Sequence, residues 1–250
     1  MRSFFKLTLV QLKLFLREPA AFFFTLAFPL LLLLLFGIIF GNEPQPAAAG
    51  FGPDGFGYID AEVPALTALI IGTVALLGIP IATATAREQR VLRRFRATPM
   101  QPWAYLAADV VVYFILALVG MVLLVVVGRL VYNLRFDGAL PALLAGFSLS
   151  TLAFVAVGYL IASLAATARV AQVVGNLFFF PMMFLSGAAI PLQFIPESVR
   201  RVSDWFPMTL VVKLLHGLWF GEGWNWTAVV ILVGMLIAGT VLSVRTFRWE

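Results

Sequence analysis

The chain has 250 residues, of which 62% are hydrophobic and 12% are charged, and its mean hydropathy is +1.01. A soluble domain carries roughly 25% charged and 45–50% apolar residues, so a water-soluble fold would leave too much apolar surface exposed. The absence of cysteine excludes disulfides and a thiol nucleophile, and the single histidine argues against a zinc site. We therefore expect an all-α polytopic membrane protein that forms one domain over residues 1–250.

The formal net charge is +5. In a soluble protein, a basic balance would raise nucleic acid as a partner. Here the cations cluster between apolar segments, in the pattern that sets membrane topology. We expect membrane lipid, and no nucleic acid, around this chain.

The first segment, residues 1–19, has cations at helical spacing on one narrow face, with leucine and phenylalanine around the rest. This pattern predicts an amphipathic helix in the cytoplasmic interface of the membrane. The alternative is an ordinary positive flank that anchors the first span. The cations are Arg2, Lys6, Lys13 and Arg17.

Six apolar segments are long enough to cross roughly 30 Å of hydrocarbon, which takes about 20 helical residues. The first is too long for the apolar part of a secretion signal and has no clean cleavage site, so we expect a retained span. Arg169 separates the fourth and fifth segments, which indicates a tight turn near the lipid surface. The predicted spans are residues 20–41, 63–86, 104–129, 139–167, 170–190 and 224–245.

Lys and Arg are distributed unequally between alternate loops. Twelve of the 17 fall on the side that holds both ends of the chain, and five fall on the other side. This excess predicts cytoplasmic N- and C-termini in a bacterial or archaeal inner membrane. The first external loop has no cation, and its acids are Glu43, Asp54, Asp60 and Glu62.

Residues 88–98, between the second and third spans, predict a basic amphipathic helix that two prolines end. Val91, Leu92 and Phe95 fall on one side, and arginines fall on the other. The positive-inside signal explains the arginines alone, whereas the apolar ridge favours docking into a groove on another protein.

Asp109, near the cytoplasmic start of the third span, is the one acid that we place close to the membrane core. An ionisable residue in a span is a functional candidate. The alternative, which we favour, is that Asp109 pairs with a loop arginine or caps its helix. Asn176 in the fifth span is a second candidate intramembrane polar residue.

Residues 191–222 are broken by prolines and are too short and too polar for another crossing. We expect short extracellular re-entrant helices that dip into the outer leaflet or lie on it. Nucleotide-binding and metalloprotease motifs are absent from the sequence. We therefore expect no catalytic, cofactor-binding or metal-binding residue, and energy for active transport would come from outside the chain.

Three motifs follow one another along the chain. The first is Arg17-Glu18-Pro19, then Phe28-Pro29 and a leucine run to Phe36-Gly37. The second is Arg87-Glu88-x-x-x-Leu92-x-Arg94-Phe95-Arg96-Ala97-Thr98-Pro99. The third runs from Phe180-Pro181 to Ser186-Gly187, with Pro191, Pro196 and Phe206-Pro207-Met208-Thr209 after it. In this order they resemble the membrane subunit of an ABC-2 type ATP-binding-cassette exporter, over essentially the whole chain, with Phe95 where leucine is commoner.

This resemblance implies a permease that pairs with a second copy or a paralogue above two P-loop ATPase subunits, which hold ATP and Mg. It implies that residues 88–98 are the coupling helix and that the N-terminal helix is the family's connecting helix. The cargo would be a drug-like compound or a lipid-linked glycan, and apolar walls suit a hydrophobic or amphiphilic one. The implied ATPase-coupling residues are Glu88, Val91, Leu92, Arg94, Phe95 and Arg96.

Two other functions remain open. An ion-coupled secondary transporter would need intramembrane acids or interrupted helices in two matching halves, and the sequence indicates neither. A non-transporting membrane scaffold or assembly protein is harder to separate from an exporter subunit, because neither needs catalytic residues. A neighbouring gene for a P-loop ATPase would distinguish the two.

Overall fold

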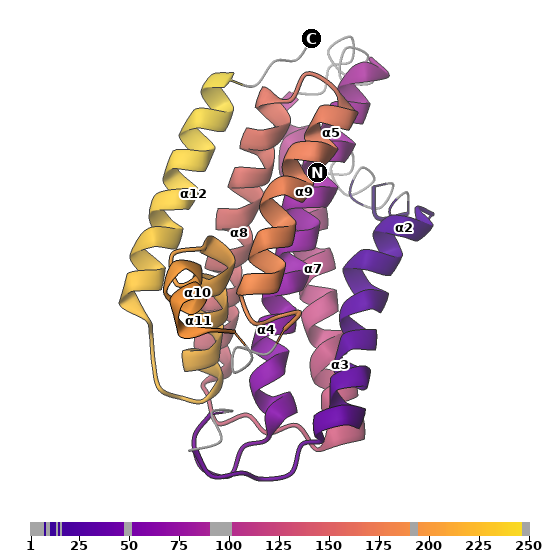
Figure 1. Ribbon diagram of the computed structural model, residues 1–250. Coiled ribbons are helices and arrows are strands. Elements are labelled where there is room, and N and C mark those ends of the chain that lie inside the picture. The colour runs from indigo at the N-terminus through magenta and orange to yellow at the C-terminus, as the bar shows by residue number, and fades with distance from the viewer. Residues whose placement is uncertain are drawn as a thin grey trace.

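The computed structural model describes residues 8, 11–13, 15, 17–47, 52–90, 102–190 and 195–246, without the side chains of residues 20 and 102–105. Within these ranges the chain is helical, as predicted, and its one strand-like contact is an isolated bridge between Gln45 and Phe56. The elements (Figure 1, with η for π-helix) are α2 (Pro19–Phe22), η1 (Phe23–Ala27), α3 (Phe28–Phe40), α4 (Tyr58–Gly72), η3 (Thr73–Gly78), α5 (Ile79–Glu88), α7 (Pro102–Tyr132), α8 (Leu140–Leu164), α9 (Ala168–Leu185), α10 (Glu197–Ser203), α11 (Pro207–Trp219) and α12 (Trp226–Thr246).

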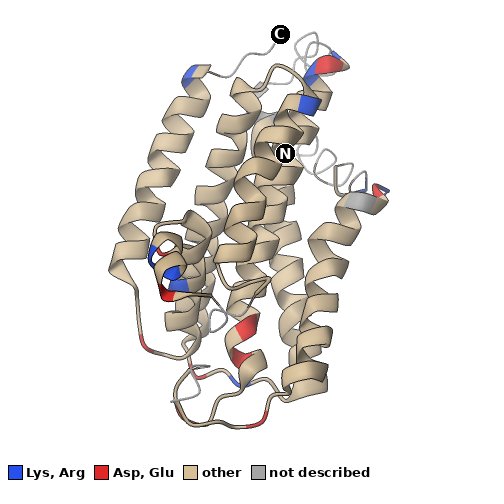
Figure 2. Ribbon diagram, in the orientation of Figure 1, with Lys and Arg blue, Asp and Glu red and all other residues tan. Residues whose placement is uncertain are grey.

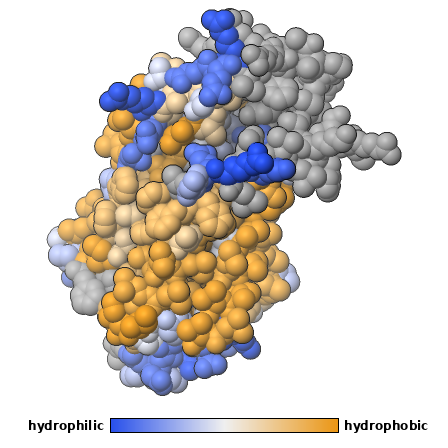
Figure 3. Space-filling view, turned by 90° about the vertical axis from the view of Figure 1, so that its right-hand side faces the viewer, coloured by the Kyte–Doolittle hydropathy of each residue, from blue (hydrophilic) through white to orange (hydrophobic). Residues whose placement is uncertain are grey.

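Six helical stretches are long and apolar enough to cross a membrane, which confirms the predicted number of spans. The shortest have 18 residues, about 27 Å at 1.5 Å per residue. Figure 3 shows one side of the molecule as an apolar band between hydrophilic ends. The chain is therefore a multi-pass membrane protein. The spans are Phe23–Phe40, Tyr58–Glu88, Leu106–Tyr132, Leu140–Leu164, Ala168–Leu185 and Trp226–Thr246.

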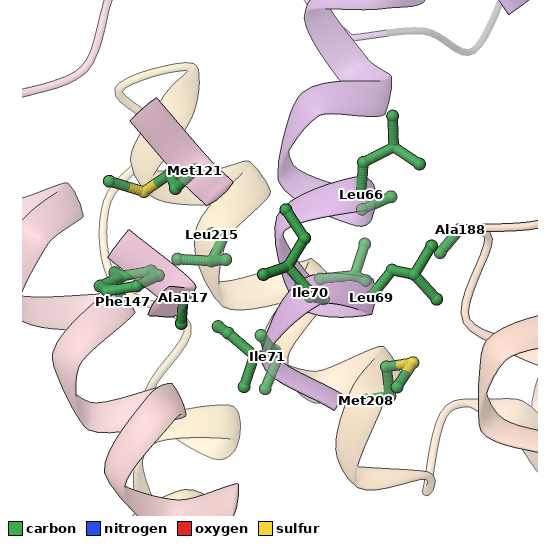
Figure 4. Close-up of a cluster of buried hydrophobic side chains, with 14 of the residues drawn as sticks. Leu66, Leu69, Ile70, Ile71, Ala117, Met121, Phe147, Ala188, Met208 and Leu215 are labelled. Atoms are coloured by element: carbon green, nitrogen blue, oxygen red, sulfur yellow. The ribbon is translucent and has the colours of Figure 1, made fainter. Parts of the chain in front are cut away.

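The second span, α4–η3–α5, forms the centre of the helix bundle. In its most apolar stretch 78% of the residues are buried, against 22% for α9 and for α12. α4 packs against α3, α7 and α11, and α5 packs against α8 and α9. Figure 4 shows side chains of α4 among those of α7, α8 and α11 in one apolar cluster. It labels Leu66, Leu69, Ile70 and Ile71 of α4, with Ala117, Met121, Phe147, Met208 and Leu215 of its neighbours.

Two glycines allow close packing on the π-helical segment η3. A Cβ added at Gly158 of α8 would collide with the carbonyl oxygen of Ala75, and one added at Gly175 of α9 would collide with that of Leu76. Short π-helical segments interrupt the regular hydrogen-bond ladder and often occur at functional positions. The middle of the second span is therefore an irregular segment that two neighbouring helices contact through their backbones.

Between α9 and α12 the chain forms two short helices with opposite surroundings. α10 is exposed except for Ser203, whereas α11 is buried along most of its length and packs against α4 and α8. These lie within the segment 191–222, for which short helices were predicted, although residues 191–194 fall outside the described residues. Their depth in a membrane remains a prediction.

Charged residues of the spans gather toward the two ends of the bundle (Figure 2). One end, which we call the Arg87 end, carries Arg87 and Glu88 of α5 and Arg245 of α12. The opposite end, the Asp60 end, carries Asp60 and Glu62 in α4. Most residues between them are apolar, so polar contacts inside the bundle are few and each can be considered separately.

Candidate functional site

The segment predicted to couple the chain to a partner begins at the Arg87 end. α5 ends at Glu88, and Arg90 has a φ of 57°, which a non-glycine residue adopts rarely and which turns the chain away from the helix axis. Glu88 is therefore the last residue of the second span's helix, not the first residue of a separate helix. The other predicted coupling residues lie outside the described residues, and their docking role stays a prediction. These are Val91, Leu92, Arg94, Phe95 and Arg96.

The last turn of α5 holds the connection between α8 and α9. The Arg87 guanidinium donates to the carbonyl oxygens of Ala162 and Ala165. The Glu88 carboxylate accepts from the backbone N–H of Ala168, at 3.0 Å. Charge-assisted hydrogen bonds are stronger than neutral ones, so two adjacent side chains fix the turn between the fourth and fifth spans to the end of the second. We call this contact the α5 clasp.

The α5 clasp could not be read from the sequence. Its partners on α8 and α9 are backbone groups about 80 residues away, and backbone groups carry no sequence signal. Thr167 completes the turn, since its hydroxyl accepts from the N–H of Val170, at 3.2 Å, and caps α9. A threonine before an apolar helix is a recognisable start signal, and it marks where α9 begins.

Asp109 lies in α7 and is buried. Its Oδ2 accepts a hydrogen bond from the hydroxyl of Tyr159 in α8, at 2.7 Å. Asp109 lies inside α7 and therefore does not cap the helix, and its partner among the described residues is a tyrosine from another span. The expected pairing with a loop arginine stays a prediction, because Arg93, Arg94 and Arg96 lie outside the described residues. The pair joins α7 to α8 inside the bundle.

Asn176 lies half-buried on α9, one turn after the exposed amide of Gln172. The two residues are four positions apart and therefore neighbours on one face of α9, whose exposed surface is otherwise mostly apolar. Side-chain amides that face hydrocarbon without partners are unfavourable. Asn176 thus lies at the partly exposed surface of α9, whereas Asp109 is buried in α7.

Asp60 forms the best-connected polar cluster of the described residues. Its carboxylate is fully buried and accepts from Asn42 Nδ2 at 3.0 Å, Arg135 N at 2.8 Å and Gly57 N at 2.8 Å. An ion pair with Arg135, at 3.4 Å, completes the contacts. The indole N–H of Trp219 donates to the carbonyl oxygen of Arg135, at 2.9 Å. This network joins the beginnings or ends of α3, α4, α7 and α11.

We expected Asp60 and Glu62 in an external loop, and this was wrong. α4 begins at Tyr58, and the two acids are 0% and 5% exposed. The missed signal is the capping pattern of Gly57 and Asp60 at the start of an apolar run, in which Asp60 accepts from the N–H of Gly57. Cutting the chain at its charges hid that pattern.

Metal-binding geometry does not occur in the described ranges, where no three His, Asp or Glu side chains come together. A shallow pocket of about 350 Å³ lies in the connection between α7 and α8 at the Asp60 end. It is lined by Arg129, Asn133, Leu134, Arg135, Phe136 and Asp137.

Comparison with known proteins identifies a family for this chain. The family profile described as ABC-2 type transporter matches residues 2–220. The probable multidrug ABC transporter permease YbhR of Escherichia coli (strain K12) is 27% identical over 176 residues, which cover 68% of this chain and 48% of that protein.

Two further relatives from the same organism agree with this match. The inner membrane transport permease YhhJ is 22% identical over 189 residues, 72% of this chain and 50% of that protein. The probable multidrug ABC transporter permease YbhS is 24% identical over 183 residues, 73% of this chain and 48% of that protein. The chain thus spans about half the length of the curated relatives that it matches.

Proposed function

Because the chain belongs to the ABC-2 type transporter family, we propose that this membrane permease subunit forms the translocation path of an ATP-driven exporter. It acts as a pair, with a second copy or a paralogue. Separate P-loop ATPase subunits, two per complex, bind ATP and Mg and supply the energy. The family match over residues 2–220 carries this proposal, and the absence of a nucleotide-binding motif from the sequence agrees with it.

The Arg87 end faces the cytoplasm in this proposal, and the membrane is the inner membrane of a bacterium or archaeon. The excess of Lys and Arg in the segments at this end supports that orientation. The amphipathic N-terminal segment then lies at the cytoplasmic surface. The Asp60 end, with its acids and its shallow pocket, faces outward.

Energy enters through residues 88–98, which dock on an ATPase subunit and move when it closes on ATP. Because Arg87 directly precedes this segment and Glu88 begins it, its displacement pulls on the α5 clasp. The pull reaches the turn between α8 and α9 as well as α5. The π-helical segment η3 is the joint at which α5 changes its angle to α4. The two states of the partner ATPase supply the difference in free energy that any such switch requires.

The pair forms through the surface that includes α9. Among the spans with little burial, α9 exposes the amide of Gln172 and half-exposes that of Asn176, whereas the exposed polar residues within α12 before Arg245 are threonines. A threonine hydroxyl can bond to its own helix, but an amide in hydrocarbon needs an outside partner. Covering α9 with a second copy supplies that partner and leaves α12 facing lipid.

The substrate is hydrophobic or amphiphilic, because it passes between helices with mostly apolar surfaces. Two of the relatives are named as probable multidrug permeases, which supports a drug-like compound ahead of a glycan.

Co-expression with the P-loop ATPase from the same operon tests the proposal. Changing Arg94 and Phe95 together to alanine should lower the amount of co-purified ATPase by at least about tenfold, since central interface residues each contribute 2 kcal/mol or more. The control changes Arg201 and Val202, an adjacent exposed cation and apolar residue on α10, to alanine. Full retention of the ATPase and of its coupling in the first variant would remove the docking role of residues 88–98.

A further inference from the structure

Glu62 is a buried acid that the coupling route does not use. It is 5% exposed, and its Oε1 has no hydrogen-bond partner among the described residues. It lies one helical turn after Tyr58, whose hydroxyl interacts with the Glu62 carboxyl. A buried carboxyl with an unused acceptor is costly, and ionisable residues kept inside membrane helices mark sites of function.

The other buried acids differ from Glu62 in their contacts. Both carboxylate oxygens of Asp60 accept hydrogen bonds, and Arg135 balances its charge. Asp109 accepts from Tyr159, which ties two spans together. None of the ion pairs found in the described part of the chain involves Glu62. Asp60 and Asp109 thus have structural roles, whereas Glu62 keeps an acceptor and a charge for a group from outside.

Three aromatic rings form a cluster that includes Tyr58, one helical turn before Glu62. The ring of Tyr58 is 4.5 Å from that of Phe40 and 5.9 Å from that of Phe36, centre to centre. Phe36 and Phe40 are half-buried on α3, and the neighbouring Ile38 is 80% exposed. The aromatic cluster therefore extends from the buried carboxyl toward the apolar surface of the bundle, where α3 meets the surroundings.

We propose that Glu62, Tyr58, Phe36 and Phe40 bind a lipophilic organic cation. Aromatic rings attract a cation within about 6 Å of their centres, most strongly away from water. A bound cation stabilises the ionised form of the Glu62 carboxyl, whose opposite charge disfavours anions and favours cations over neutral compounds of the same shape. The inference rests on the proposed function, because it names the class of cargo that the permease takes.

Entry to this site needs movement of α3. The span that contains α3 buries only 33% of its most apolar stretch, while the span that contains Glu62 is the most buried of the six. α3 is therefore the helix that separates from α4 with the smaller loss of packing. A cation dissolved in the bilayer would reach the rings of Phe36 and Phe40 first and the carboxylate last.

Equilibrium binding to the purified complex of permease and ATPase tests the proposal. The probes are tetraphenylphosphonium, a permanent lipophilic cation, and triphenylmethane, a neutral compound with a similar shape. Glu62→Gln, which keeps the size of the side chain, should weaken tetraphenylphosphonium binding by at least about tenfold and triphenylmethane binding by less than about twofold. Glu222→Gln, at an exposed acid, is the matched control and should change neither.

Equal loss of both probes in Glu62→Gln, or unchanged binding of the cation, would overturn the proposal. If that variant does not fold, the rate at which dicyclohexylcarbodiimide labels Glu62 in the wild-type complex tests the proposal instead. Tetraphenylphosphonium should lower this rate by at least about tenfold, and triphenylmethane should leave it unchanged. Equal labelling with and without the cation would also overturn it. If the complex assembles and hydrolyses ATP but fails these tests, only the proposed cation site is refuted. If the chain does not assemble with the ATPase, the proposed exporter function is refuted.

Discussion

The two ends of the bundle are held by different amounts of polar bonding. At the Asp60 end, a fully buried carboxylate gathers Asn42, Gly57 and Arg135, and Trp219 extends the network to a fourth helix. At the Arg87 end, one turn of α5 holds the connection of α8 and α9 through two side chains that are at least partly in contact with solvent. We infer that the first end keeps the helices in place and that the second can move when a partner pulls on it.

Removing the centre of the stronger network should have the largest effect. Asp60→Ala leaves the backbone N–H groups of Gly57 and Arg135 without their buried acceptor and removes the ion-pair partner of the Arg135 guanidinium. We expect the free energy of unfolding in detergent to fall by about 3–5 kcal/mol, measured by thermal unfolding of the purified chain. Glu43→Ala, at an exposed acid, should change it by less than about 0.5 kcal/mol. A fall of the same size in both variants would refute the special role of Asp60.

An intermediate effect is expected at the joint between the two ends. Gly158→Ala places a Cβ against the carbonyl oxygen of Ala75 in η3, which should cost about 1–3 kcal/mol and slow ATP-coupled transport. Gly234→Ala in α12 is the control, because nothing lies within 4 Å of the added Cβ; it should be neutral or slightly stabilising. Similar behaviour of the two variants in unfolding and transport would argue against a tight joint at η3.

The smallest effect on stability, with a large effect on coupling, is expected at the weaker end. Arg87→Ala removes the donor to Ala162 and Ala165 and should cost about 1 kcal/mol, since water replaces part of the interaction. ATP-coupled transport in vesicles should nevertheless fall by about tenfold or more, while ATPase binding is kept. Arg245→Ala, which changes an exposed arginine in the last turn of α12, outside residues 88–98, should retain more transport. Normal transport by Arg87→Ala would show that the α5 clasp does not transmit movement.

The sequence predicted the number of spans and their order, because long runs of leucine, valine and phenylalanine are stable in the hydrocarbon of a membrane and not in water. It misplaced the start of the second span, since Asp60 and Glu62 were taken as the mark of a loop. Their helical state depends on Asn42 and Arg135, and the latter lies 75 residues away. For Asp109 the sequence likewise gave no sign of Tyr159, because pairing between spans depends on how helices rotate against each other.

Some features of the candidate site follow from the local sequence pattern, and others follow only from the packing of the helices. The amphipathic character of residues 88–98 is local, and it predicts a docking segment without any knowledge of the fold. The α5 clasp and the aromatic cluster that includes Tyr58 join α5 to α8 and α9, and α3 to α4. They appear only once the helices are assembled, so no window of sequence could reveal them.

The π-helical segment η3 has one more consequence. Such a segment is in effect an α-helix with one surplus residue, and each residue of an α-helix turns the chain by roughly 100°. The wider turn of η3 takes up the surplus residue locally. Deleting a single residue between Thr73 and Gly78 would therefore restore a regular helix and leave Arg87 and Glu88 pointing in about the same direction. The surplus residue thus alters the path of the second span in its middle without changing the contacts that its last turn makes.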